Sequence, residues 1–126
     1  MNTTAILLLC LGGALGAVSR YWLTRLGGLL APDTHFPLPT LFINISGSAL
    51  LGLVFGLMEP DFTALIDSPI ILFFGVGFCG AYTTFSSFCT ETVALIPQSA
   101  AKAGLYIFST IIGSIAAFVA VFHLLA

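Results

Sequence analysis

The chain has 126 residues, of which 59% are hydrophobic and 6% are charged, and its formal net charge is -2. So few charges exclude an ordinary water-soluble domain, and the slightly negative balance gives no basis for nucleic-acid binding. We therefore expect an integral membrane protein made of one domain, residues 1–126, embedded in a lipid bilayer.

Four apolar runs are each long enough to cross the bilayer as a helix, since one crossing takes about 20 residues. They are residues 3–26, 40–58, 69–96 and 103–125. The prolines lie at or near the ends of these runs, where they disturb a helix least. The connections are too short to build an enzyme pocket, so we expect an all-α membrane fold without enzymatic activity.

The first run carries Arg20 near its carboxyl end, beside Tyr21 and Trp22. A long basic side chain in this position can extend to the lipid headgroups, next to interfacial aromatic residues. A fixed cation can equally stand at the mouth of a pore and draw anions from solution. The sequence leaves both roles open.

The second run contains a single carboxamide, Asn44. A polar side chain at that depth is costly unless partnered, so Asn44 either clasps a neighbouring helix or donates to an anion. Small residues spaced by four, such as Gly12 and Gly16 or Gly52 and Gly56, indicate close helix packing. Because four helices hardly enclose a pathway alone, we expect a homodimer.

The third run is too long for one straight crossing, and its centre, residues 77–88, holds glycines and hydroxyl residues in place of leucine and valine. Non-helical backbone at membrane depth persists only where protein or a solvated cavity satisfies it. Broken helices of this kind present carbonyl groups to cations and amide groups to anions. We therefore predict a break near Gly80 to Thr83, with an ion site beside it.

Aromatic and hydroxyl side chains follow this predicted break. Phe85 and Phe88 are three residues apart and so share one helix face, where their electropositive ring edges can hold an anion. Simple packing is the alternative reading for both rings. Ser86 and Ser87 add two hydroxyl groups beside them.

The fourth run places Tyr106, Thr110 and Ser114 at intervals of four residues, which gives a stripe of hydroxyl groups on one helix face. In lipid such groups can bond to their own helix or bridge to a neighbour. A line of donors can also replace the water around an anion that crosses the membrane. The spacing alone favours neither role.

Three sequence blocks resemble the motifs of a known family. Residues 80–88 read Gly-Ala-Tyr-Thr-Thr-Phe-Ser-Ser-Phe, which resembles the Gly-Gly-x-Thr-Thr-Phe-Ser-Thr-Phe signature of the Fluc (CrcB) family of small dual-topology fluoride channels. Residues 12–21 and 40–47 resemble the first-helix and second-helix motifs of the same family. The matches occur in the same order as in the family and cover nearly all of the chain.

The resemblance implies a passive, fluoride-exporting channel in a bacterial-type cell inner membrane, formed by an antiparallel homodimer whose third helices are broken at mid-membrane. It also implies a structural sodium ion at the dimer centre, held by the backbone carbonyl groups of Gly80 and Thr83. The implied partners are fluoride, sodium, the lipid bilayer and a second copy of the chain. The candidate residues of the fluoride pathway are Arg20, Asn44, Phe85, Ser86, Ser87, Phe88, Tyr106, Thr110 and Ser114.

The chain departs from the family signature at Ala81, Tyr82 and Ser87. Alanine is strained at position 81 if the backbone there needs a positive φ, whereas serine keeps the hydroxyl group of the usual threonine. The main alternative function is a small dual-topology proton-coupled multidrug exporter, which needs a membrane-embedded carboxylate that the first run lacks. A helper protein that only packs against partner helices is a third reading, but it leaves the centre of the third run unexplained.

Overall fold

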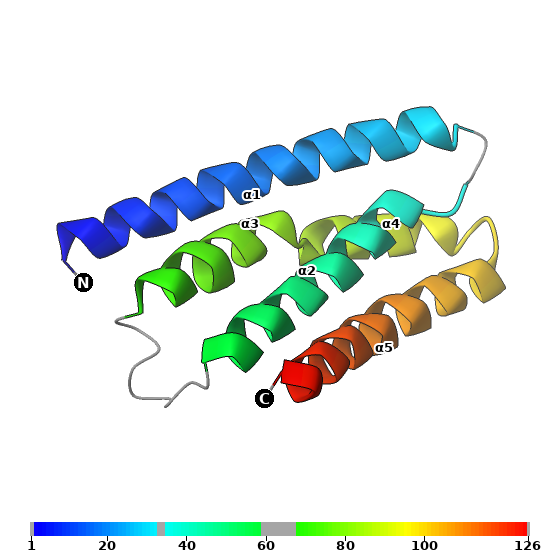
Figure 1. Cartoon of the computed structure of the whole chain (residues 1–126). Helices are drawn as coiled ribbons and strands as arrows, with labels where there is room; N and C mark the ends of the chain where they lie inside the picture. Colours follow the sequence, from blue (N-terminus) through cyan, green and yellow to red (C-terminus); the bar gives the residue numbers. More distant parts are fainter. Residues whose placement is uncertain (1, 33–34, 59–67, 126) are drawn as a thin grey trace.

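The computed structural model describes residues 2–32, 35–58 and 68–125, and this part of the chain is helical and contains no strand. It has four helical spans long and apolar enough to cross a membrane, which confirms the predicted all-α membrane fold with four crossings. The elements, drawn in Figure 1, are α1 (Thr3–Leu30), α2 (Leu38–Met58), η1 (Ile71–Cys79), α3 (Gly80–Tyr82), α4 (Phe85–Leu95) and α5 (Ala100–Leu125).

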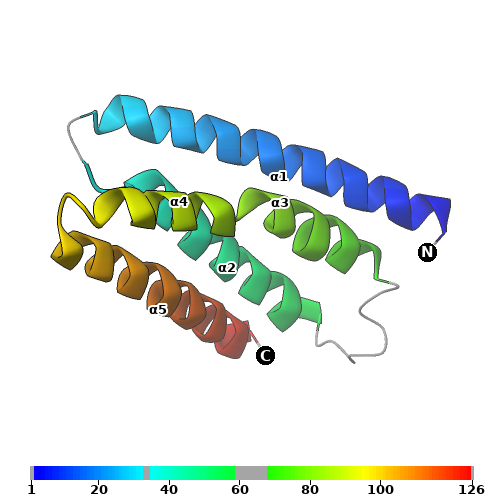
Figure 2. The ribbon, with the colours of Figure 1, turned by 180° about the vertical axis from the view of Figure 1, so that it is seen from behind.

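The spans lie side by side, and each runs opposite to the one before it (Figures 1 and 2). Helix α1 packs along η1 and α3, while α2 packs chiefly against α5. The third span consists of η1, α3 and α4 in succession, with an interruption between α3 and α4. This interruption is therefore flanked by α1 on one side and by the α2–α5 pair on the other.

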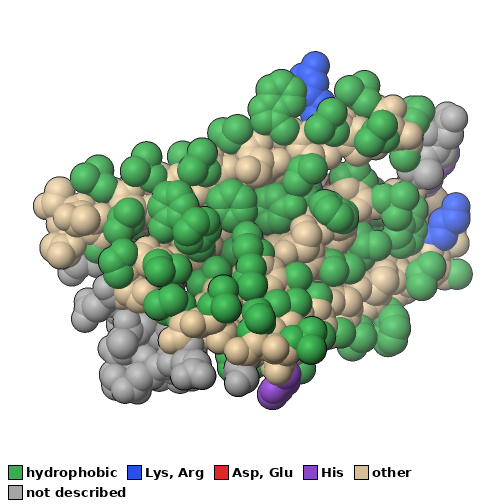
Figure 3. Space-filling view, in the orientation of Figure 1, with side chains coloured by type: hydrophobic (Ala, Val, Ile, Leu, Met, Phe, Trp, Pro, Cys, Tyr) green, Lys and Arg blue, Asp and Glu red, His purple; other side chains and the backbone are tan. Residues whose placement is uncertain are grey.

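Hydrophobic side chains cover much of the face shown in Figure 3. Large apolar residues such as Leu7, Leu15, Phe42 and Phe108 are exposed on the long helices. A surface so rich in apolar side chains is unfavourable in water but is suited to lipid chains. The composition of the sequence and its arrangement in space agree on a multi-pass membrane protein.

Two helix ends differ from the predicted bounds. Helix α1 continues to Leu30 instead of ending at residue 26, because Gly27 makes room for the ring of Pro39, whose Cγ lies 2.5 Å from where a Cβ would stand. Helix α5 begins before the predicted residue 103, since the Ser99 hydroxyl accepts a hydrogen bond of 3.3 Å from the backbone N–H of Lys102. The remaining ends agree within about two residues.

Glycines let the spans touch through their backbones. Gly12 and Gly16 on α1 face backbone carbonyl groups of η1, and a Cβ at either position would collide with them. On α2, a Cβ at Gly52 would lie 2.5 Å from the carbonyl oxygen of Phe118 on α5. The four-residue spacing of small residues thus predicted the faces along which the helices approach.

Replacement of Gly52 by alanine is expected to lower the thermal unfolding temperature, because the added methyl group must separate α2 from α5. Overpacking of this kind costs about 1–3 kcal/mol. Gly104 on α5 is the matched control, since no atom lies within 4 Å of a Cβ built there. Gly104→Ala should be neutral or slightly stabilising, and equal melting curves for both variants in detergent would contradict the close α2–α5 contact.

The third span changes its backbone conformation along its length. Segment η1 is a π-helix, a rare form that often marks functional segments. Gly80 is helical, with φ -62° and ψ -35°, and Ala81 lies inside α3, so the strain considered for alanine does not arise. The extended residues are Thr83 (φ -74°, ψ 160°) and Thr84 (φ -148°, ψ 121°). The interruption therefore starts at Thr83, whereas Gly80, the first residue of the predicted interval, is helical.

Candidate functional site

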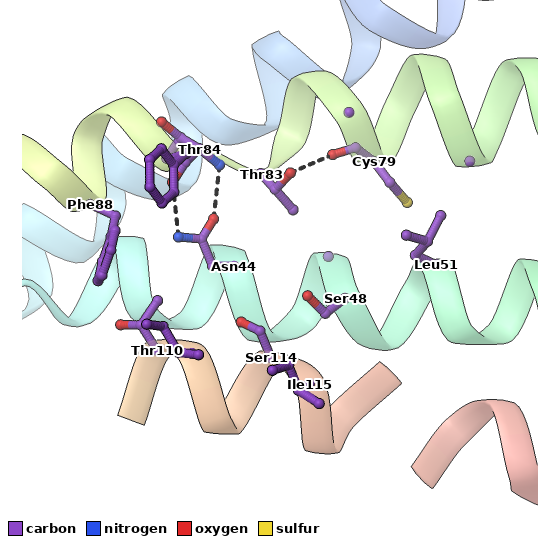
Figure 4. Close-up of a pocket in the computed structure, with 15 residues that line it drawn as sticks. Asn44, Ser48, Leu51, Cys79, Thr83, Thr84, Phe88, Thr110, Ser114 and Ile115 are labelled. Atoms are coloured by element: carbon purple, nitrogen blue, oxygen red, sulfur yellow. Dashed lines mark hydrogen bonds between the residues drawn. The ribbon is translucent and has the colours of Figure 1, made fainter. Parts of the chain in front are cut away.

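Asn44 joins α2 to the interruption of the third span. Its Nδ2 donates to the carbonyl oxygen of Thr84 at 3.0 Å, and its Oδ1 accepts from the N–H of Thr84 at 2.8 Å (Figure 4). These two bonds satisfy a backbone donor and acceptor that lie outside any helix and are buried from solvent. Asn44 is thus an interhelical clasp in this structure, one of the two roles that the sequence left open.

Threonine hydroxyl groups satisfy the helix ends on both sides of the interruption. Thr83 Oγ1 donates to the carbonyl oxygen of Cys79 at 2.9 Å, at the end of the preceding helix. Thr84 Oγ1 accepts from the N–H of Ser87 at 3.2 Å and so forms the N-cap of α4. Thr83 therefore ends one helix and Thr84 starts the next.

A pocket of about 400 Å³ lies beside this interruption, between α2, the third span and α5. Figure 4 shows the residues that line it, drawn from segments far apart in the sequence. The structure brings together a large part of the predicted pathway here. The predicted pathway residues that line this pocket are Asn44, Phe85, Phe88, Thr110 and Ser114.

The two phenylalanines differ in how firmly they are held. Their ring centroids are 5.7 Å apart with the planes tilted by 41°. Phe88 is only 8% exposed and contacts the ring of Tyr106 at a centroid distance of 5.4 Å, whereas Phe85 is 76% exposed. Within one chain, Phe88 belongs to the wall of the pocket and Phe85 stands at its edge.

Two hydroxyl groups of α5 are buried in this pocket without a partner. Thr110 is 5% exposed, and neither its Oγ1 nor the Oγ of Ser114 has a hydrogen bond. An unsatisfied buried hydroxyl costs about 1–3 kcal/mol, so it is rarely kept without a ligand or water to bond. The neighbouring Ser109 shows the contrast, since its hydroxyl donates to the carbonyl oxygen of Leu105 at 2.6 Å.

Tyr106, predicted to share the stripe with Thr110 and Ser114, does not line the pocket. It is completely buried, and its hydroxyl donates to Glu91 Oε2 at 2.7 Å. Thr40 Oγ1 donates to Glu91 Oε1 at 2.9 Å, so two hydroxyl groups from α2 and α5 hold one carboxylate of α4. A helix turns by about 40° beyond a full circle in four residues, so a stripe at this spacing drifts around the helix.

This Glu91 cluster was missed by sequence reasoning, although one signal for it existed. Glu91 is the one acidic residue within an apolar run, and such residues need a partner at membrane depth. In the structure its partners are the hydroxyl groups of Thr40 and Tyr106. Which side chains meet Glu91 depends on how each helix is rotated about its axis, and the positions of charged residues in the sequence do not show this rotation.

Arg20, Ser86 and Ser87 line a second pocket, of about 450 Å³, between α1 and the start of α4. The Nη1 of Arg20 donates to the carbonyl oxygen of Thr83 at 3.2 Å, so the guanidinium turns toward the interruption and not toward the lipid headgroups. The second pocket shares Thr84 with the first. The predicted pathway residues are thus divided between two pockets that meet at the interruption, with Tyr106 in neither.

The carbonyl groups predicted as sodium ligands differ in their surroundings. In a continuous helix the N–H of Thr84 would bond the carbonyl oxygen of Gly80, but here it bonds Asn44. The carbonyl oxygen of Gly80 therefore lacks the N–H donor that it would have in a continuous helix. An oxygen of this kind is suited to bind a cation. The oxygen of Thr83 already accepts from Arg20 and has only its second lone pair to offer.

Comparison with known proteins matches the sequence to one family. Residues 7–122 match the family described as CrcB-like protein, Camphor Resistance (CrcB). The chain is 40% identical over 120 residues to "Fluoride-specific ion channel FluC 1" of Halalkalibacterium halodurans, covering 94% of both chains. It is 41% identical over 122 residues to the protein of the same name from Nitrobacter hamburgensis, covering 95% of this chain and 94% of the relative.

A third relative, "Fluoride-specific ion channel FluC" of Anaeromyxobacter dehalogenans, is 43% identical over 114 residues, which cover 89% of this chain and 87% of that one. The matches extend over all four spans of the structure and over the interruption of the third. The resemblance predicted from residues 12–21, 40–47 and 80–88 is therefore confirmed over nearly the whole chain. This multi-pass membrane protein belongs to the CrcB (Fluc) family.

Proposed function

We propose that the chain forms a fluoride-selective channel that exports fluoride passively. The observation that carries the proposal is the pair of buried, unpartnered hydroxyl groups, Thr110 and Ser114, in the same pocket as Phe88 and Asn44. The relatives named fluoride-specific ion channels give the identity of the ion. Expression in a bacterium without its own fluoride exporter should restore growth on fluoride medium, and failure of a well-expressed protein to do so would contradict export.

The chemistry of the pocket suits a small, strongly hydrated anion. Fluoride gives up its water only where several hydrogen-bond donors replace it, and Thr110 and Ser114 offer two in succession along α5. The ring edges of Phe85 and Phe88 are electropositive without carrying a full charge, so they attract the anion without trapping it. Among the residues that line this pocket, none is a lysine or arginine.

Export needs no energy source beyond the membrane potential. Hydrogen fluoride enters cells as a neutral weak acid and dissociates inside, where fluoride accumulates. A selective channel then lets the inside-negative potential drive the anion out across the cell inner membrane. The membrane potential and the fluoride gradient set the direction of net flow, and the pathway must exclude the more abundant anions such as chloride so that they do not flow as well.

The working unit is proposed to be an antiparallel homodimer with two pathways. Phe85 is 76% exposed at the edge of the pocket, and a Cβ at Gly80 would meet no atom within 4 Å, so this face of the third span is open to a second copy. Both broken segments would then meet at mid-membrane. Protease access to a carboxyl-terminal tag in sealed vesicles tests this arrangement: half of the tags should be cut, and tags on one side only would contradict it.

A structural sodium ion is proposed where the two third spans meet. Backbone carbonyl oxygens are hard ligands that broken membrane helices direct at cations. Gly80, without its helical donor, and Thr83, through its second lone pair, would supply them from each chain. One chain offers too few oxygens to hold the ion, so sodium and the dimer depend on each other.

A proton-coupled multidrug exporter is the alternative that the sequence left open. The family match over residues 7–122 and the names of the relatives do not favour it. Such an exporter also needs a membrane-embedded carboxylate for proton coupling. The carboxylate within the described spans, Glu91, is held by Thr40 and Tyr106 away from the first pocket.

Thr110→Val is expected to slow fluoride efflux about tenfold, a loss typical of one hydrogen bond to a charged partner. Valine keeps the shape of threonine and removes the donor. Ser109→Ala is the matched control on the same helix, because the Ser109 hydroxyl already bonds Leu105 outside the pocket. Efflux from proteoliposomes measures both, and equal effects would show that the hydroxyl groups of α5 are not part of the pathway.

A further inference from the structure

Ser48 on α2 lines the same pocket as Thr110 and Ser114 but was not among the pathway residues predicted from the sequence (Figure 4). It lies one helical turn after Asn44, so both side chains project from the same face of α2. In the sequence, Ser48 stands out only as a small residue four positions before Gly52, which indicates packing. The structure places its hydroxyl beside the proposed anion pathway.

The serine and threonine side chains of α2, α4 and α5 divide into two groups. Those that face away from the pocket or lie at its edge are bonded to protein: Ser46 contacts Tyr82 Oη at 2.9 Å, and Thr92 donates to the carbonyl oxygen of Phe88 at 2.7 Å. The same holds for Thr40, Ser86, Ser87, Thr90 and Ser109. Among the described residues of these helices, the buried hydroxyl groups of Thr110 and Ser114 have no hydrogen bond. The half-buried Ser48 also makes no such bond, and all three residues line the one pocket.

This division has a physical reason. A hydroxyl group in an apolar helix bonds back to its own helix when nothing else is offered, because an unbonded hydroxyl there is unfavourable. Side chains that leave this bond unmade on two different helices, α2 and α5, point to a shared ligand between them. If these serine and threonine residues served only as small residues for helix packing, there would be no reason for all of them to face the same pocket.

We propose that the Ser48 hydroxyl donates a hydrogen bond to the fluoride ion in the pathway, from the wall formed by α2. This inference rests on the proposed function. Donors on α5 alone would solvate one side of the ion, while Ser48 and the remaining N–H of Asn44 complete its shell from α2. Because a chloride ion is larger and less strongly hydrated, a two-sided set of donors favours fluoride.

The test compares Ser48→Ala with Ser46→Ala, two residues away on the same helix and outside the pocket. Ser48→Ala should lower fluoride efflux from proteoliposomes about tenfold, and Ser48→Thr, which keeps the donor, should stay within about threefold of the unchanged protein. Ser46→Ala should transport normally. All variants should elute as the unchanged protein does on size exclusion.

The outcomes separate this inference from the proposed function. If the unchanged protein and Ser46→Ala transport fluoride but Ser48→Ala transports equally well, Ser48 is only a packing residue and the inference is overturned. If the unchanged protein itself carries no fluoride, the proposed function is overturned before Ser48 is considered. If Ser48→Thr is as slow as Ser48→Ala, the size of the side chain and not its hydroxyl controls the rate, which also overturns the inference.

Discussion

Replacement of Phe88 by isoleucine is expected to lower fluoride efflux about 100-fold, equivalent to about 2.7 kcal/mol in the barrier. The ring is 8% exposed in the wall of the pocket, 5.7 Å from Phe85 between centroids. Isoleucine keeps most of the volume and the apolar character but has no electropositive edge to face an anion. Efflux from proteoliposomes, recorded with a fluoride electrode, measures the change.

Phe85→Ile provides the sharper version of the same prediction. Phe85 is 76% exposed, so a residue kept only for packing within its own chain would tolerate isoleucine there. We expect a loss of transport similar to that of Phe88→Ile, with the proposed dimer intact on size exclusion. Phe108, which is exposed on α5 outside the pocket, is the control and should accept isoleucine without loss. Full transport by either purified pocket variant would remove the ring-edge mechanism at that position.

Asn44→Asp is expected to abolish fluoride transport and to lower the thermal unfolding temperature at neutral pH. An ionised aspartate still accepts from the N–H of Thr84 but no longer donates to its carbonyl oxygen, and it places a negative charge beside the proposed anion pathway. Leaving a buried carbonyl without its donor costs about 1–3 kcal/mol. Melting curves in detergent and efflux measurements report the two effects separately.

The control for Asn44 is Asn44→Ala, which removes the clasp without adding charge. It should melt at a similarly lowered temperature, because Thr84 loses both partners, and it should transport poorly because the interruption is no longer held open. If Asn44→Ala melts and transports as the unchanged protein does, the Asn44–Thr84 pair does not maintain the interruption. The role of Asn44 as a clasp would then be wrong.

The spans and the helix contacts could be predicted from the sequence because they depend on local patterns. Hydropathy gave the four crossings, and small residues spaced by four gave the close approach at Gly12, Gly16 and Gly52. The end of α1 was missed because Gly27 was read as the start of a loop. Its role depends on Pro39, which contacts it from another helix, and local sequence carries no sign of such a contact.

The candidate site could be predicted only in part, since its residues depend on the rotation of each helix. Spacing placed Tyr106 in one stripe with Thr110 and Ser114, but the carboxylate of Glu91 binds its hydroxyl and keeps it out of the pocket. For Arg20 the sequence left open an interaction with lipid headgroups and a place at a pore mouth. In the structure its guanidinium donates to the carbonyl oxygen of Thr83 and so turns toward the interruption. Each of these outcomes follows from a polar partner more than ten residues away in sequence.

Fluoride efflux from proteoliposomes that contain the purified protein tests the central claim most directly. The vesicles are loaded with potassium fluoride or potassium chloride, and valinomycin is added so that potassium can follow the anion. We predict rapid release of fluoride to the electrode and chloride release no faster than from protein-free vesicles. Fluoride release at the protein-free rate, or chloride release as fast as fluoride release, would contradict a fluoride-selective channel.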